Sequence, residues 1–288
     1  MASPAVKILC DSCVDLPPTL MKERGLKPIP LTVNFGNESL KDGLDITPQD
    51  FYRRLRSEKV LPTTTQVSPA EYMAAFDEAL AAGGSAVYIG LSSGLSGTMQ
   101  SARLAAQEYG DRVKLVDSLG ASVGLGLMVL RATDLAAAGA SADEIVADIT
   151  AFRARMCHVF TLDTLEYAHK GGRVSTAAAV ASRLLDVKAV LHMDMAGKLI
   201  PIDRVRGRKR SLHRLFEEME RLGANVRGKR VGLCHADAAT EAAEIAEQFR
   251  TQYGAAEVVV GEIGPTIGAH TGPGCISIFF EGPAGRGE

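Results

Sequence analysis

The chain has 288 residues, of which 46% are hydrophobic and 23% charged, values typical of a soluble globular protein with one large or two ordinary domains. The formal net charge of -2 gives no global reason to expect nucleic acid as a partner. No secretory signal is visible in the sequence. The most apolar stretch, residues 119–130, is well short of the ~20 residues that span a bilayer, so we expect it to be a buried helix in a cytoplasmic protein without membrane insertion.

The first half of the chain alternates strand-like and helix-like segments. Strands that are regularly separated by helices predict a mostly parallel sheet with helices on both faces. Residues that cap helix N-termini support this reading, because Ser68 and Ser141 each begin a capping box and Thr47 precedes a proline. We therefore expect an N-terminal α/β domain of α/β/α type over residues 1–156, with strands at 6–10, 29–35, 86–91 and 112–116.

The rhythm changes after about residue 157. Two extended runs around Ala196-Gly197 predict a β-hairpin, and helices and strands follow in a less regular order. We expect a C-terminal α+β domain with a mixed sheet over residues 157–288. Its predicted strands are 157–162, 188–195, 198–205, 230–235, 257–261 and 275–280, and its predicted helices are 175–185, 211–222 and 240–253.

A polar turn, Leu91-Ser92-Ser93-Gly94-Leu95-Ser96-Gly97-Thr98, joins the strand-like run 86–91 to a helix predicted over 99–109. Such a turn leaves free N–H groups and several hydroxyls at the start of the helix. These N–H groups and the positive end of the helix dipole favour an anion. The turn therefore predicts an anion-binding site.

The same turn allows a different function. Gly90-Leu91-Ser92-Ser93-Gly94 matches G-x-S-x-G, the nucleophile elbow of serine hydrolases, in the required strand–turn–helix context. Ser92 would be the nucleophile and His270 the base, with Asp203 or Asp237 as the acid. Against this, a hydrolase helix begins at the nucleophile, whereas a second hydroxyl-rich stretch intervenes here. A serine hydrolase is the alternative hypothesis.

The cysteines indicate little chemistry. Cys10-Asp11-Ser12-Cys13 has the C-x-x-C spacing of redox motifs, but Asp11 and Asp15 disfavour a thiolate. The other possible zinc ligands, Cys157-His158 and Cys234-His235, are adjacent pairs on strand-like runs, where neighbouring side chains point to opposite faces. We expect neither a redox centre nor a metal site.

Three further segments are polar. Pro62-Thr63-Thr64-Thr65-Gln66 is interpreted as a polar loop, and residues 267–274 place His270 in a glycine-rich loop that packs close to another group. The basic run from Arg204 to Arg214 is interpreted as a solvated face and a helix start, with nucleic-acid binding as a weaker hypothesis. The chain contains neither G-x-x-x-x-G-K-[ST] nor G-x-G-x-x-G, so no recognisable nucleotide-binding loop is present.

Seven segments spread almost end to end are distinctive in their order along the chain. They are Cys10-Asp11-Ser12-Cys13-Val14-Asp15-Leu16-Pro17, Thr63-Thr64-Thr65-Gln66, Leu91 to Thr98, Val116-Asp117-Ser118, Lys170-Gly171-Gly172-Arg173, Val205-Arg206 and Ala269-His270-Thr271-Gly272-Pro273-Gly274. Together they resemble the DegV family, the bacterial fatty-acid-binding proteins. Two positions depart from the family pattern: Cys13 stands where Ser or Thr is usual, and Gly207 where a Thr commonly follows the arginine.

The resemblance implies a two-domain protein that holds one long-chain fatty acid, such as palmitate, stearate or oleate, in an apolar tunnel between the domains. Thr64 and Ser96 would hold the carboxylate, Arg206 and His270 would lie by the head group, and Arg173 has no assigned role. A fatty acid kinase would phosphorylate the bound acid to an acyl phosphate for phospholipid synthesis. The protein would then be a carrier without catalytic residues or cofactors. Supporting loop residues would be Thr65, Ser92, Ser93, Gly94, Gly97 and Thr98.

Overall fold

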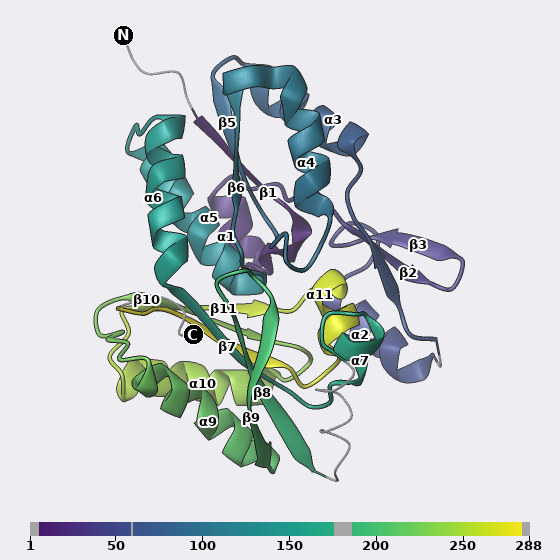
Figure 1. The fold of residues 1–288 in the computed structure, drawn as a ribbon, viewed down its shortest axis with the longest axis vertical. Coiled ribbons are helices and arrows are strands. Elements are labelled where there is room, and N and C mark those ends of the chain that lie inside the picture. The colour runs from purple at the N-terminus through teal and green to yellow at the C-terminus, as the bar shows by residue number, and fades with distance from the viewer. Residues whose placement is uncertain (1–5, 59, 176–185, 284–288) are drawn as a thin grey trace.

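A computed structural model describes residues 6–58, 60–175 and 186–283, and its first half forms an α/β/α sandwich (Figure 1). Three parallel strands pair in the order β1-β5-β6. Helices α3 and α4 cover one face of this sheet, and α5 and α6 cover the other. The elements are β1 (Val6–Cys10), η1 (Ser12–Val14), α1 (Pro18–Glu23), β2 (Thr32–Phe35), β3 (Glu38–Lys41), α2 (Pro48–Ser57), β4 (Thr63–Thr65), α3 (Pro69–Leu80), β5 (Ser85–Gly90), α4 (Thr98–Ala106), η2 (Gln107–Arg112), β6 (Val113–Asp117), α5 (Ser122–Ala137) and α6 (Ala142–Arg155).

The predicted helix starts are confirmed. The Ser68 and Ser141 hydroxyls each accept a hydrogen bond from the backbone N–H three residues later, and the glutamates at those positions accept from the capping residues in return. The Thr47 hydroxyl accepts from the N–H of Asp50, with Pro48 at the first helical position. Local sequence therefore determines where α2, α3 and α6 begin.

A small antiparallel sheet in the order β3-β2-β4 corrects two predictions. The strand predicted at residues 29–35 is shorter and joins this sheet rather than the parallel one. Thr63–Thr65 is a strand and not a loop, because its backbone pairs with β2 in the register Thr32 opposite Thr65. Threonine favours extended backbone, but three residues are too few for sequence alone to distinguish a strand from a loop.

The second half contains the predicted mixed sheet, whose six strands lie in the order β11-β10-β12-β7-β8-β9. Helices α9 and α10 pack on its outer face, while α5 of the first half lies against the inner face (Figure 1). The predicted helix at 175–185 lies almost wholly outside the described residues. The elements are β7 (Met156–Leu162), α7 (Glu166–Lys170), β8 (Val187–Met193), β9 (Leu199–Arg206), α9 (Arg208–Arg221), β10 (Arg230–His235), α10 (Ala239–Thr251), β11 (Glu257–Glu262), α11 (Pro265–Thr271) and β12 (Ile276–Glu281).

Helix α11 corrects the prediction of a glycine-rich loop over residues 267–274. Pro265 occupies the first turn, and the helix ends at Gly272, whose φ of 68° requires the left-handed conformation that glycine tolerates. The helix packs against α2, β2 and β4 of the first half and against α7 of the second. It therefore connects the two halves at the place where His270 lies.

One of the hydrophobic clusters extends through both halves. Helix α5 is apolar on nearly all sides, and Val123, Leu125 and Met128 are fully buried. It contacts β1 and β5 of the parallel sheet and also β7, β10, β11 and β12 of the mixed sheet. The predicted boundary after residue 156 falls where α6 gives way to β7, and it stays a prediction. No helix within the described ranges is both long and apolar enough to cross a membrane.

Candidate ligand-binding site

A cavity lies between the inner face of the mixed sheet and the first half of the chain. Most of the wall that the described residues form is apolar, and none of these lining residues is Lys, Asp or Glu. The lining residues are Leu31, Thr64, Leu91, Leu95, Ser96, Ala121 and Ser122 from the first half, and His158, Phe160, Arg173, Met193, Leu199, Ile263, Thr266, Ile267, His270, Thr271, Cys275, Ser277 and Phe279 from the second.

Four of the lining side chains form a polar cluster, Thr64, Ser96, Arg173 and His270. The Thr64 hydroxyl and His270 Nε2 are 2.9 Å apart, within hydrogen-bond distance. Arg173 Nε donates to the backbone carbonyl of Leu95, the residue before Ser96, at 3.0 Å. These four side chains lie in one part of the cavity. They come from strand β4, the loop before α4, the segment after α7 and helix α11.

The polar cluster carries one permanent positive charge. Burial lowers the pKa of Arg173, but a guanidinium keeps its proton in proteins. Burial, with a smaller contribution from the Arg173 charge, lowers the pKa of His270 to about 4, so this imidazole is neutral near pH 7. His270 Nδ1 is buried and has no hydrogen-bond partner among the described residues. The cluster is therefore suited to an anion, with Arg173 supplying the charge.

The loop that carries Ser96 is held in place by buried polar groups. Asp11 Oδ2 accepts hydrogen bonds from the Tyr88 hydroxyl at 2.7 Å and from the N–H of Leu91 at 2.8 Å. At the far end of the loop, the Thr98 hydroxyl bonds to Tyr72 at 2.9 Å. Asp11 of the Cys10–Cys13 motif thus positions the loop.

The N–H groups of this loop are less free than its sequence predicts. Those of Gly94 and Thr98 bond to the hydroxyls of Ser92 and Ser96, and those of Leu95 and Ser96 bond to the Ser92 carbonyl. Helix α4 also has Gly97 as its N-cap, without a side-chain cap. The loop would therefore offer an anion the Ser96 hydroxyl proton, because that oxygen already accepts from Thr98.

The geometry speaks against a serine hydrolase. The Ser92 side chain is buried, donates to the carbonyl of Gly197 at 2.8 Å, and does not line the cavity. His270 bonds to Thr64 instead. The two candidate acids are paired elsewhere, Asp203 with Arg214 and Asp237 with an arginine of α2. Ser92 therefore fastens the loop to the β8–β9 hairpin.

The remaining predicted site residues lie around the cavity rather than in its wall. Arg206 is exposed at the end of β9, opposite Val187. There is no room for a side chain at Gly94, because a Cβ there would lie 2.7 Å from the carbonyl oxygen of Gly197. Thr65, Ser93 and Gly97 are exposed, and Thr98 is buried. Arg173 does line the cavity, although the resemblance assigned no role to this residue of the Lys170-Gly171-Gly172-Arg173 motif.

A second pocket adjoins the polar cluster on its outer side. It shares Thr64, Arg173 and His270 with the main cavity. Its other lining residues include Lys170 and Tyr167 of α7. The polar cluster thus stands between an apolar interior and a second, more polar space.

Comparison with known proteins decides the family. A family model described as "Uncharacterised protein, DegV family" matches residues 5–282. The chain belongs to the DegV family. A DegV domain-containing protein of Clostridium perfringens is 36% identical over 282 residues, which cover 96% of this chain and 97% of that protein.

Solved DegV family structures share the fold. One from Thermus thermophilus, described by its fatty acid binding, has a TM-score of 0.89 and 32% sequence identity, and the match covers 97% of this chain and 100% of that one. The Streptococcus pneumoniae Fatty Acid Kinase (Fak) B3 protein loaded with linoleic acid has a TM-score of 0.86, 22% identity and the same coverage. The second likeness is one of fold.

Two buried carboxylates anchor α11 in this DegV protein. Asp15 accepts from the N–H of Gly264 at 2.9 Å and from the Ser122 hydroxyl at 2.5 Å. Asp42 accepts from the N–H of Thr266 at 3.1 Å and from a serine hydroxyl of η1. Because Ser122 and Thr266 line the cavity, these carboxylates stand directly behind its wall.

These carboxylates should make stability depend on pH. Burial raises the pKa of Asp15 to about 7 and that of Asp42 to about 6. A folded-state pKa above the unfolded value means that the folded protein gains stability as pH falls through about 7. For Asp15 alone, we expect the free energy of unfolding to be about 1 kcal/mol higher at pH 6.5 than at pH 8. Urea denaturation across this range will measure the slope.

The substitution Asp15→Asn should flatten this slope, because the amide does not titrate. Asp143→Asn is the matched control, since Asp143 is exposed on α6 and should leave the slope unchanged. An identical slope in the wild type and both variants would show that Asp15 does not titrate near neutral pH.

The environment of the cysteines disfavours redox chemistry. All five are free and buried. Burial and the nearby Asp11 raise the pKa of the Cys10 and Cys13 thiols, so both stay protonated. Within the described residues, no group of three or more His, Cys, Asp or Glu side chains could hold a metal ion.

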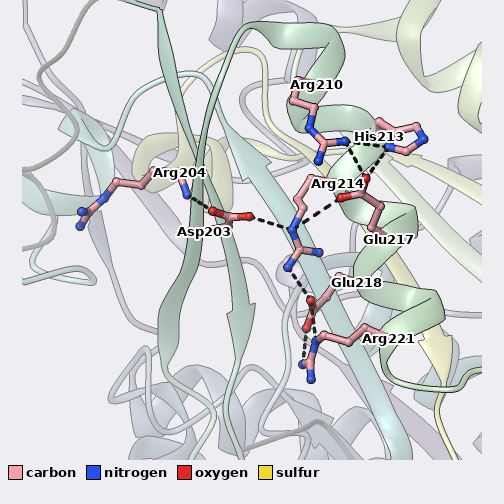
Figure 2. Close-up of polar contacts among 8 residues, drawn as sticks. All are labelled: Asp203, Arg204, Arg210, His213, Arg214, Glu217, Glu218 and Arg221. Carbon is pink, nitrogen blue, oxygen red and sulfur yellow. Dashed lines mark hydrogen bonds and ion pairs between the residues drawn. The ribbon is translucent and has the colours of Figure 1, made fainter.

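The basic run on β9 and α9 is partly neutralised by its own neighbours. Arg214 lies between Asp203 and the buried Glu218, which also binds Arg221 (Figure 2). Arg210 pairs with a glutamate two turns further along α9. Arg204 and Arg206 are exposed on β9. The pairing of the α9 arginines supports the interpretation as a solvated face, because paired guanidinium groups are poorly suited to phosphate contacts.

Proposed function

We propose that this DegV protein holds one long-chain fatty acid, with its chain in the apolar cavity and its carboxylate against Thr64, Ser96, Arg173 and His270. The supporting observation is a cavity whose wall, as far as the described residues form it, is mostly apolar and carries a single permanent charge, that of Arg173. A carboxylate on a long apolar chain is the complement of such a space. The Thermus thermophilus relative, described by its fatty acid binding, supports the same ligand class.

The two parts of the ligand would contribute differently. Burying about 14 methylenes at ~0.8 kcal/mol each gives on the order of 11 kcal/mol before ordering costs. A hydrogen bond to the charged carboxylate adds about 1.5–3 kcal/mol. The tail therefore sets most of the affinity, and the polar cluster determines which end of the acid faces outward.

The same proposal makes the protein a carrier rather than an enzyme. The carboxylate would face the second pocket, where a separate fatty acid kinase could phosphorylate it to an acyl phosphate for phospholipid synthesis. Exposed Arg206 would then contact the head group or the kinase. The Fak B3 protein of Streptococcus pneumoniae, with the same fold, is consistent with this role. Because this kinase would use ATP, the proposal also places the carrier in the cytoplasm.

Lipid extraction tests the proposal directly. We expect protein purified from cells and extracted under denaturing conditions to release close to one equivalent of long-chain fatty acid, because the apolar cavity would not stay empty in a cell. Mass spectrometry will identify and count the acid. Repeated recovery of no lipid, together with no uptake of added oleate or palmitate, would contradict fatty-acid binding.

A further inference from the structure

The strands that line the cavity show in which direction it runs. Strands β7 and β12 are antiparallel, with His158 opposite Phe279 and Phe160 opposite Ser277. All four side chains line the cavity. Successive side chains on one face of a strand are about 7 Å apart, so the His158–Phe279 pair lies one step beyond Phe160–Ser277.

The polar cluster lies at the opposite end of these strands. Arg173 comes after β7 and α7, so it lies beyond the C-terminal end of β7. His270 is on α11, which directly precedes β12 and so lies beyond the N-terminal end of that strand. In an antiparallel pair these two ends coincide. The His158–Phe279 pair is therefore at the end of the cavity remote from Arg173 and His270.

The remote end is closed by packed side chains. His158 and Phe279 are 2% and 3% exposed, and their rings meet edge to face with centroids 5.2 Å apart and an interplanar angle of 89°. Phe279 also packs against Gly232 of β10, where a Cβ would lie 3.1 Å from its ring. The pair thus separates the cavity from the backbone behind it.

Two glycines, one just before α5 and one in its first turn, pack against the imidazole. A Cβ at Gly120 would lie 2.7 Å from His158 Cε1, and a Cβ at Gly124 would lie 2.6 Å from both His158 Nδ1 and Phe279 Cδ1. Neither glycine lines the cavity. Their backbone leaves no room for the pair to move away from a longer ligand.

We propose that His158 and Phe279 form the end wall of the cavity and set the longest acyl chain that it accepts. This inference rests on the proposed fatty-acid binding. Each methylene that fits into the cavity improves affinity about fourfold. A chain that reaches the end wall gains nothing from further methylenes, because they meet side chains that cannot retreat. Affinity should then fall for longer acids.

The test is the chain-length preference of His158→Ala. We expect its affinity for a 20-carbon saturated acid, relative to palmitate, to rise at least tenfold over the wild-type ratio, because the space of the imidazole becomes available. Competitive displacement of a dansyl-labelled fatty acid will measure both affinities. His158→Phe fills the space again and should restore a preference for the shorter acid.

His192→Ala is the matched control. His192 is also a buried histidine of the mixed sheet, but it does not line the cavity, so its removal should leave the preference unchanged. If His158→Ala does not fold, Phe279→Leu should give the same shift toward longer acids. If a folded His158→Ala protein binds palmitate with an unchanged chain-length preference, the end-wall proposal is wrong, but the proposed fatty-acid binding is not. Absence of fatty-acid binding by the wild type would overturn the proposed function.

Discussion

Replacing Gly261 with alanine is expected to lower the free energy of unfolding by about 3 kcal/mol, a large effect for one added methyl group. Gly261 lies on β11 where the two halves meet. A Cβ there would fall far inside contact distance of the Asp15 carbonyl oxygen and 2.6 Å from Val123 Cγ2. The nearest atom belongs to backbone, which cannot rotate away as a flexible side chain could. Thermal or urea denaturation will measure the loss.

Gly139→Ala separates this clash from backbone strain. Gly139 follows α5 with a φ of 87°, and a Cβ there would meet nothing within 4 Å. Its substitution should therefore cost only the left-handed conformation, about 1 kcal/mol. Equal losses for Gly261→Ala and Gly139→Ala would mean that β11 shifts freely against Asp15 and that the contact between the halves is loose.

Replacing Arg173 with glutamine is expected to weaken fatty-acid binding about 10- to 100-fold, because the carboxylate would lose a charged partner in the cavity wall. Glutamine retains polar character, so the main change is the charge. The chain contains no tryptophan, so binding is best measured by displacement of a dansyl-labelled fatty acid rather than by intrinsic tryptophan fluorescence.

The fatty acid methyl ester provides the control ligand. It has the same chain but no charge, so Arg173→Gln should change its affinity little. Arg250→Gln, on the surface of α10, should leave the binding of both ligands unchanged. A parallel loss of affinity for the acid and the ester would show that Arg173 supports the cavity through its bond to Leu95 rather than by pairing with the carboxylate.

Much of the fold could be predicted from local sequence. The capping boxes at Ser68 and Ser141 act within four residues, so the starts of α3 and α6 could be located from sequence alone. The long apolar pattern of α5 likewise indicated a buried helix. The alternation of strands and helices was enough to distinguish the parallel sheet from the mixed one.

The parts that could not be predicted depend on tertiary contacts. Helix α11 spans only seven residues, one of them a glycine, and it forms where Asp15 and Asp42 accept the hydrogen bonds of its first turn. Those carboxylates come from positions more than 200 residues away in sequence. Arg173 follows the same rule, because its relation to Thr64 and His270 exists only after the two halves pack. The resemblance to the DegV family pointed to the segments that carry these residues, but the packing of the two halves determines which side chains meet.

Helix α5 constrains how a ligand can enter and leave. Because it is apolar on nearly all sides and contacts both large sheets, any rotation that parted the two halves would expose it to water. Clamshell opening, as in binding proteins whose lobes swing about a hinge, is therefore too costly here. We expect a bound acid to exchange instead through an opening that small displacements of α7 and α11 create, while the two halves stay packed against each other.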